Sequence, residues 1–279
     1  MRPPGLPIWL TALLAMLPPL LTRTAAAQDR SASVECGRGQ QGEKRLATCR
    51  ADASFNPNSI RARMAYGWAL VEAQQYPEAL REFEAALRLE PPNANAHYGR
   101  GVALQALGSR EDAVRSFQVA LRYQKDHLGA LLGLASTLKT LRRYDESVSA
   151  AQQATRVAPS DPEGHYQLAM GLLNLGKVQD ALGPLQEAAR LAPGSAAVQL
   201  QLGAVLQRQG WFEEAFKAFQ VAAQLEPANA GAWGAMGLTA AQLKRSAEAL
   251  EYRDHAVRLD PNYFASRPEE RQLKEAIKP

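Results

Sequence analysis

The sequence has few of the residues and none of the common motifs on which catalysis and metal binding depend. It contains only four histidines and two cysteines in 279 residues. Neither the H-E-x-x-H pattern of zinc peptidases nor the G-x-S-x-G pattern of serine hydrolases occurs. Gly99-Arg100-Gly101 lies in a helical pattern with no strand before it, so it does not predict a dinucleotide loop. We therefore expect a non-catalytic protein with no metal and no cofactor.

The charge of the chain has little excess of either sign. The formal net charge is +4, and it would fall by two if a segment containing Arg2 and Arg23 were removed. Such a small excess does not favour nucleic acid as a partner.

The N-terminus has the pattern of a targeting segment. Arg2 precedes an apolar run, Ile8–Leu21, and Ala25-Ala26-Ala27 then supplies an A-x-A cleavage site. This order is typical of a secretory signal peptide. The run is shorter than the ~20 residues that cross a bilayer, and an uncleaved anchor is the alternative. We expect residues 1–27 to be removed and the protein to be exported, with the periplasm as its compartment.

Only Cys36 and Cys49 can form a disulfide. In an exported chain an even cysteine count predicts a bridge, and two free thiols are the alternative. A structural zinc site needs four ligands, and no histidine lies nearby. The spacing is also not the C-x-x-C of redox enzymes.

From Ile60 to Tyr263 the chain repeats every 34 residues without insertion or deletion. A fixed period of this length indicates a repeat array. One landmark is a proline near the end of each unit, replaced once by Lys125. The prolines are Pro91, Pro159, Pro193, Pro227 and Pro261.

Each repeat reads as two helices joined by a short turn. In the unit 196–229, Val198, Leu202 and Val205 have helical spacing, Gly210 interrupts the pattern, and a second apolar face follows. Small residues at matching phases of both helices indicate close approach. Glycine costs a helix about 1 kcal/mol relative to alanine, so its recurrence points to packing that outweighs this cost.

The repeats resemble tetratricopeptide repeats. The family pattern has a small residue at phase 8, Ala at 20, an aromatic at 24, Ala at 27 and Pro at 32. The unit 60–93 matches it with Gly67, Ala79, Phe83, Ala86 and Pro91. Departures occur in the third and sixth repeats, which we expect to pack less tightly. They are Ser147, Ala151 and Arg253, beside Lys125 in the second repeat.

The resemblance implies an all-α, right-handed superhelical solenoid of six 34-residue helix-turn-helix repeats. The units are 60–93, 94–127, 128–161, 162–195, 196–229 and 230–263. Residues 28–59 form a leader with the cysteine pair and a half-repeat helix over Glu43–Ala53. Residues 264–279 are expected to form a C-terminal capping helix. End elements of this kind cover the apolar faces that a repeat array would otherwise expose.

The resemblance also implies a concave groove lined by the first helix of each repeat. Transfer of the family positions gives a wall of aromatic, Met and amide groups. Its residues are Met64, Trp68, Val71, Asn95, Tyr98, Val102, Gln105, Lys139, Tyr166, Met170, Asn174, Gln207 and Arg208. Such a wall suits an extended segment or an amphipathic helix. The alternative is a mostly structural lining, in which Tyr98 and Tyr166 belong to the scaffold.

Two functional hypotheses follow from this organisation. In the first, the protein is an exported scaffold that binds a protein or peptide in its groove. In the second, it is a structural subunit of a cell-envelope complex, such as a polysaccharide or outer-membrane assembly machine, and uses its convex face and ends. Trp211 and Phe212, adjacent at a turn, could form a second contact surface. The basic residues Lys139, Arg142 and Arg143 are expected to form a solvated turn, and an anionic-ligand site is the alternative.

Overall fold

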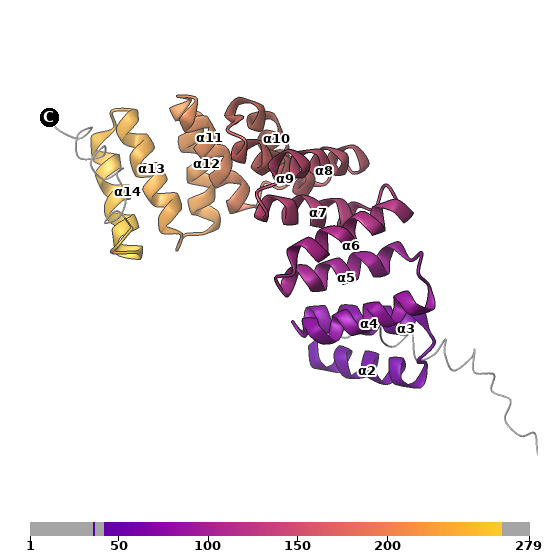
Figure 1. Ribbon diagram of the computed structural model, residues 1–279. Coiled ribbons are helices and arrows are strands. Elements are labelled where there is room, and N and C mark those ends of the chain that lie inside the picture. Colours follow the sequence, from indigo (N-terminus) through magenta and orange to yellow (C-terminus); the bar gives the residue numbers. More distant parts are fainter. Residues whose placement is uncertain (1–35, 37–41, 264–279) are drawn as a thin grey trace, which may run out of the picture. The chain divides into compact units, whose positions relative to one another are not determined.

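A computed structural model describes Cys36 and residues 42–263 of the chain. This part is all-α and contains thirteen helices, numbered α2 to α14. None of the helices within it is long and apolar enough to cross a membrane. The described residues form two compact units, one ending at Pro91 and the other beginning at Pro92. Figure 1 labels their helices.

Twelve of the helices form six consecutive pairs, and α2 (Gly42–Phe55) precedes them. Every first helix begins at the first residue of a 34-residue unit expected from the sequence. The first helices are α3 (Ile60–Glu72), α5 (Ala94–Ala106), α7 (Leu128–Thr140), α9 (Pro162–Asn174), α11 (Ala196–Arg208) and α13 (Ala230–Gln242). The second helices are α4 (Tyr76–Leu89), α6 (Arg110–Tyr123), α8 (Tyr144–Val157), α10 (Val178–Leu191), α12 (Phe212–Leu225) and α14 (Ser246–Leu259).

Each first helix has an N-cap residue whose side chain accepts a hydrogen bond from a backbone N–H of the first turn. Such caps satisfy amides that have no partner within the helix. The capping residues are Ser59, Asn93, His127, Asp161, Ser195 and Asn229. Histidine is not among the favoured capping residues, and its part in this series could not be read from the residue type alone.

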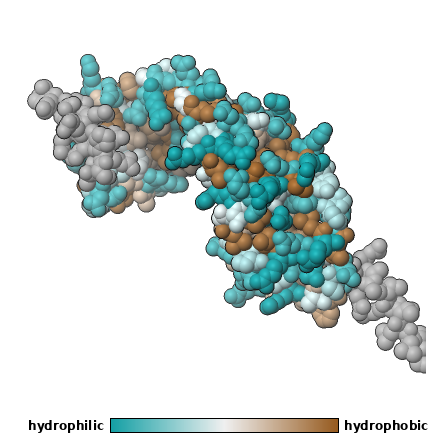
Figure 2. All heavy atoms as spheres, viewed as in Figure 1, coloured by the Kyte–Doolittle hydropathy of each residue, from teal (hydrophilic) through white to brown (hydrophobic). Residues whose placement is uncertain are grey.

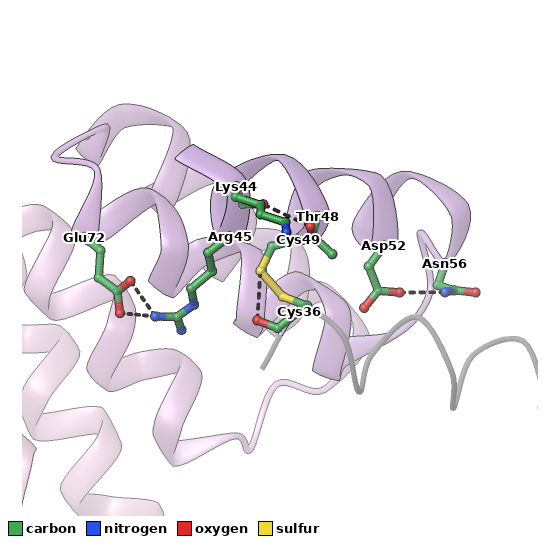
Figure 3. The surroundings of a disulfide bond; sticks show 8 residues. All are labelled: Cys36, Lys44, Arg45, Thr48, Cys49, Asp52, Asn56 and Glu72. Carbon is green, nitrogen blue, oxygen red and sulfur yellow. Dashed lines mark hydrogen bonds and ion pairs between the residues drawn. A yellow bond between two sulfur atoms is a disulfide. The ribbon is translucent and has the colours of Figure 1, made fainter. Parts of the chain in front are cut away.

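In the first unit, α2 packs on α3 as the leader segment predicts, over Gly42–Phe55 rather than Glu43–Ala53. Cys36 and Cys49 are joined by a disulfide with their Cα atoms 4.9 Å apart. The bridge is buried against Ala69 of α3. Arg45 of α2 pairs with Glu72 of α3, as Figure 3 shows. The disulfide therefore ties α2 to Cys36, and α2 is held on the first repeat by the packing of this bridge on Ala69 and by the Arg45–Glu72 ion pair.

In the second unit the paired helices pack through glycine and phenylalanine. Gly203 of α11 lies so close to the buried ring of Phe219 in α12 that an added Cβ would be 2.6 Å from it. Gly101 stands in the same relation to Phe117. Glycine lets the two helices close onto the ring, and burial of the ring offsets the helix-propensity cost.

The expected looser packing of the third and sixth repeats is not found. In the third, Ser147 is fully buried and its hydroxyl donates to the carbonyl of Ala135 at 2.7 Å. In the sixth, no aromatic ring separates the helices, and a Cβ on Gly237 would lie 3.2 Å from the carbonyl oxygen of Ala249. Where the aromatic ring is missing, the two helices of the repeat lie closer together, because small residues on both sides permit backbone contact.

Two expectations lie outside the described residues: the signal peptide at 1–27 and the capping helix at 264–279.

Within the described part, Figure 2 shows hydrophilic side chains over much of the visible face with apolar groups between them.

Candidate partner-binding surface

The residues predicted to line a groove are divided between the two units. Met64, Trp68 and Val71 lie on α3 of the first unit, where all three are partly buried. The ring of Trp68 packs edge-on against Phe83, with centroids 5.1 Å apart. The other ten lie in the second unit, on the first helices α5, α7, α9 and α11. We call the surface of α5, α7, α9, α11 and α13 the inner wall.

At the start of the inner wall, Tyr98 and Asn95 support the next repeat. The Tyr98 ring lies 4.9 Å from the imidazole of His127 and 6.0 Å from the ring of Phe117. Burial raises the pKa of the Tyr98 hydroxyl. Asn95 Oδ1 is 3.1 Å from Nε2 of His127. These contacts support the structural reading of Tyr98, because its ring is held within the scaffold.

Lys139 and Gln207 also contact neighbouring repeats. The ammonium of Lys139 donates to Oε1 of Gln167 at 3.0 Å, and Gln167 donates to Glu163 at 2.6 Å. Burial lowers the pKa of Lys139, and the charge of Glu163 partly opposes this. Gln207 donates to the hydroxyl of Thr239 at 3.3 Å. Both side chains thereby link successive first helices.

The three basic residues near the third turn do not converge on one site. Lys139 reaches toward α9, whereas Arg143 pairs with Glu146 at 2.7 Å and with Glu111 at 3.2 Å. The bond to Glu146 raises the pKa of Arg143 and lowers that of Glu146. The partly exposed, ion-paired Arg143 fits the solvated turn expected from the sequence.

Three of the predicted residues do come together, around a hollow between α9 and α11. The hollow has a volume of about 270 Å³. It lies where two neighbouring first helices approach less closely than α5 and α7 or α7 and α9 do. Its lining consists of Met170, Leu173, Asn174, Gln201, Ala204, Val205 and Arg208.

Gln201, Ala204 and Val205 are not among the groove residues predicted from the sequence. Gln201 and Ala204 are three residues apart and therefore face the same side of α11. Ala204 has the same repeat phase as Met170, but its short side chain leaves space where Met170 fills it. A comparison of side-chain size at one phase along the array is the signal that could have identified this hollow.

Trp211 and Phe212, which the sequence predicts as a second contact surface, border a hollow of their own. Trp211 is 47% exposed, directly before α12. It borders a shallow hollow of about 420 Å³ with Phe212 and Leu243. Beside this hollow, Arg245 pairs with Glu213 at 2.8 Å and lies over the ring of Phe216. The hollow beside Trp211 is shallower than the hollow between α9 and α11.

Tyr166, Val102 and Gln105 complete the predicted set. All three are partly buried on the inner wall. Burial is the main cause that raises the pKa of the Tyr166 hydroxyl, and nearby Glu163 adds to it. Tyr166 packs against the apolar clusters around Leu185 and Ala188, so it too contributes to the scaffold.

Family comparisons match three stretches of the chain to the same kind of repeat. Residues 67–108 match a model described as TPR repeat, and residues 132–196 and 230–263 match models described as tetratricopeptide repeat. No match was found among curated proteins.

Solved structures with the same fold cover most of the chain. YrrB, described as a TPR protein with an unusual peptide-binding site, has a TM-score of 0.61 and 23% identity, over 69% of this chain and 97% of its own. PilF of Pseudomonas aeruginosa has a TM-score of 0.68 and 19% identity, over 77% and 96%. The APC/C hetero-tetramer Cut9–Hcn1 has a TM-score of 0.66 and 18% identity, over 93% and 50%. At these identities the likeness concerns the fold.

Proposed function

Because the chain is a tetratricopeptide-repeat protein, we propose that it is a non-catalytic scaffold that binds a protein or peptide in the groove along its inner wall. The hollow between α9 and α11 is the observation that carries this proposal. Apolar residues line this hollow beside amide and guanidinium groups. Such a combination holds the side chains of a peptide while the amide groups form hydrogen bonds with the peptide backbone. The printed description of YrrB, a TPR protein with a peptide-binding site, supports the same reading.

The remainder of the inner wall is suited to a supporting role. Tyr98, Lys139 and Gln207 link successive first helices, Tyr98 through the His127 cap of α7. These bonds hold the first helices in register, so a bound segment meets a preorganised surface and fewer side chains lose freedom on binding. Alanine substitutions at these positions would weaken the scaffold and the surface together. They are therefore poor probes of binding.

A sharper test adds charge to two partly buried positions of the wall whose side chains do not link neighbouring helices by a hydrogen bond within the described part. We expect the double variant Gln105→Glu/Met170→Glu to lose its partner in affinity capture from native extract. A control variant, Gln152→Glu/Gln186→Glu, adds the same charge to exposed positions of α8 and α10. It should capture the same protein as the unmodified chain. Circular dichroism and melting temperature establish that both variants fold.

The reverse result would favour the second hypothesis. If the control variant alone loses the partner, the contact lies on the second helices, as a structural subunit of an envelope complex would require. In that case the exposed surface at Trp211 is the next region to test.

We also propose that the protein is exported, with the periplasm as its compartment. The proposal rests on the signal-like N-terminal sequence and on the bridged Cys36–Cys49 pair, since disulfides persist in oxidising compartments. Fractionation followed by N-terminal sequencing tests it. We expect a periplasmic chain that begins at Gln28, and a cytoplasmic chain with an intact N-terminus would contradict the proposal.

A further inference from the structure

We propose that the hollow between α9 and α11 binds a large aliphatic side chain that has an aspartate or glutamate beside it, within an extended segment of the partner. This inference rests on the proposed function and identifies the chemistry of its ligand. The aliphatic group would lie against Ala204, and the carboxylate would pair with Arg208.

The size of the hollow selects a side chain over a larger ligand. Its volume of about 270 Å³ lies below the range of about 300–1,000 Å³ that is usual for small-molecule sites. Met170, Leu173 and Val205 provide apolar lining, and Ala204 leaves the space open. An aliphatic group of a partner would remove this surface from water, and the flexible Met170 can adjust to its shape.

The polar groups around the hollow favour an acidic neighbour. Arg208 is the only charged residue of the lining. It makes no ion pair or hydrogen bond with any residue that the structure describes, whereas Arg143, Arg190 and Arg245 each pair with a glutamate. A guanidinium without a partner beside an apolar floor is complementary to a carboxylate.

The wider inner wall has the same sign of charge. On the first helices α5, α7, α9, α11 and α13 the formally charged residues are Arg100, Lys139, Arg208 and Glu163. Arg100 donates to Ser116 of α6, so the wall itself has the two cations Lys139 and Arg208 and one acid. The acid already accepts a hydrogen bond from Gln167. Attraction of an acidic segment would therefore act along the wall as well as at Arg208, and it would weaken as salt is added.

The amides define how the segment is oriented. Gln201 lies seven residues before Arg208, two turns along the same face of α11, with Ala204 between them. Gln201 makes no hydrogen bond with the described residues and can pair with the backbone of the segment. Asn174 uses its amide N–H on the carbonyl of Met170 at 2.7 Å, so its oxygen is the group left to accept.

The test is selection of peptides from a random octapeptide library, acetylated and amidated at its ends, on the immobilised full chain. We expect enrichment of Leu, Ile or Met adjacent to Asp or Glu. For a selected peptide, Arg208→Gln should weaken binding about fivefold, as loss of one partly solvated ion pair would. Arg208→Glu should prefer the peptide whose acid is replaced by Lys. Ala204→Leu, which fills the hollow, should abolish binding.

The control is Arg190→Gln, which removes a cation that is paired with Glu187 on α10, away from the hollow. It should leave affinity unchanged. A second library with a free C-terminal carboxylate distinguishes the source of the acid. Enrichment in that library alone would overturn the proposal in favour of a chain terminus.

The outcomes separate this inference from the proposed function. Selected peptides that lack acids, but lose binding with Ala204→Leu, would overturn the acidic ligand and leave the groove as the binding site. Selected peptides whose affinity is unaffected by both Ala204→Leu and Gln105→Glu/Met170→Glu would overturn the two together. Absence of any enrichment over a column of the Ala204→Leu variant would also overturn the ligand assigned here.

Discussion

His127 Nδ1 accepts the backbone N–H of Ala130 at 3.1 Å and thereby caps α7. Because Nδ1 is the acceptor, the neutral ring carries its proton on Nε2, which donates to Oδ1 of Asn95 at 3.1 Å. Desolvation lowers the pKa of His127, and a backbone hydrogen bond and the charge of Asp126 partly oppose it. One imidazole therefore holds the start of one repeat against the preceding repeat.

The first prediction concerns pH. The His127 pKa in the folded chain lies below its ordinary value of about 6.5, so the unfolded chain binds the proton more readily. The cap is fully stabilising above about pH 6.5, and its contribution is lost as pH falls through the folded pKa. His127→Asn keeps a capping side chain without titration. We expect its free energy of unfolding to vary less than that of the unmodified chain between pH 7 and pH 5.

The matched variant is His127→Ala, which should cost about 1 kcal/mol at pH 7 through loss of the cap. Urea titrations at several pH values measure both effects. An unchanged pH profile in His127→Asn would show that groups other than His127 control stability in this range.

The second prediction concerns the turns within repeats. Gln74, Arg142 and Lys244 have φ near +60°, where Gly108, Gly176 and Gly210 stand in other repeats. This conformation costs a residue with a Cβ about 1–2 kcal/mol. Glycine avoids that cost but loses more conformational entropy on folding, which offsets part of the stabilisation. Arg142→Gly should therefore stabilise the chain by up to about 1 kcal/mol.

Gly176→Arg is the reciprocal change and should destabilise by a similar amount. No atom lies within 4 Å of a Cβ placed on Gly176, so the effect would report backbone conformation alone. Chemical denaturation of both variants provides the measurement. A stabilised Gly176→Arg would contradict the strain argument.

The third prediction concerns close packing between paired helices. A Cβ at position 203 would lie 2.6 Å from the buried ring of Phe219, so Gly203→Ala should destabilise by about 1–3 kcal/mol. Gly183 lies within α10 with nothing within 4 Å of an added Cβ. Gly183→Ala should stabilise by up to about 1 kcal/mol through helix propensity. Equal effects at the two positions, measured by thermal denaturation, would refute the packing role of Gly203.

The fourth prediction concerns the disulfide of the first unit. Reduction of Cys36–Cys49 releases a short loop, and the chain-entropy account gives about 3 kcal/mol for a bridge of this size. Hydrogen exchange should increase in α2, because the bridge ties it to Cys36 and the bridged pair packs against Ala69 of α3. Exchange in α7 to α12 should stay the same, since stability in a repeat array is a sum of local terms. The double variant Cys36→Ala/Cys49→Ala should reproduce the effect without reductant.

Local chemistry in the sequence determined the period and the helix boundaries. Asn93, Asp161, Ser195 and Asn229 are ordinary capping residues, and the helices begin directly after them. The sequence also displayed the small residues at fixed phases, because close packing of the paired helices requires them in every repeat. These features depend on neighbours within one or two turns of the chain, which a single sequence displays.

The tertiary structure decided which wall residues are open to a partner. Tyr98 contacts His127, Lys139 contacts Gln167, and Gln207 contacts Thr239. Each pair links one first helix to the next, Tyr98 through the residue that caps α7, and its members lie 28 to 32 residues apart in the sequence. Family position alone placed these residues on the same wall as Arg208, which has no such contact within the described part. A hollow at Ala204 likewise depends on the distance between α9 and α11, a quantity that packing sets and no local pattern contains.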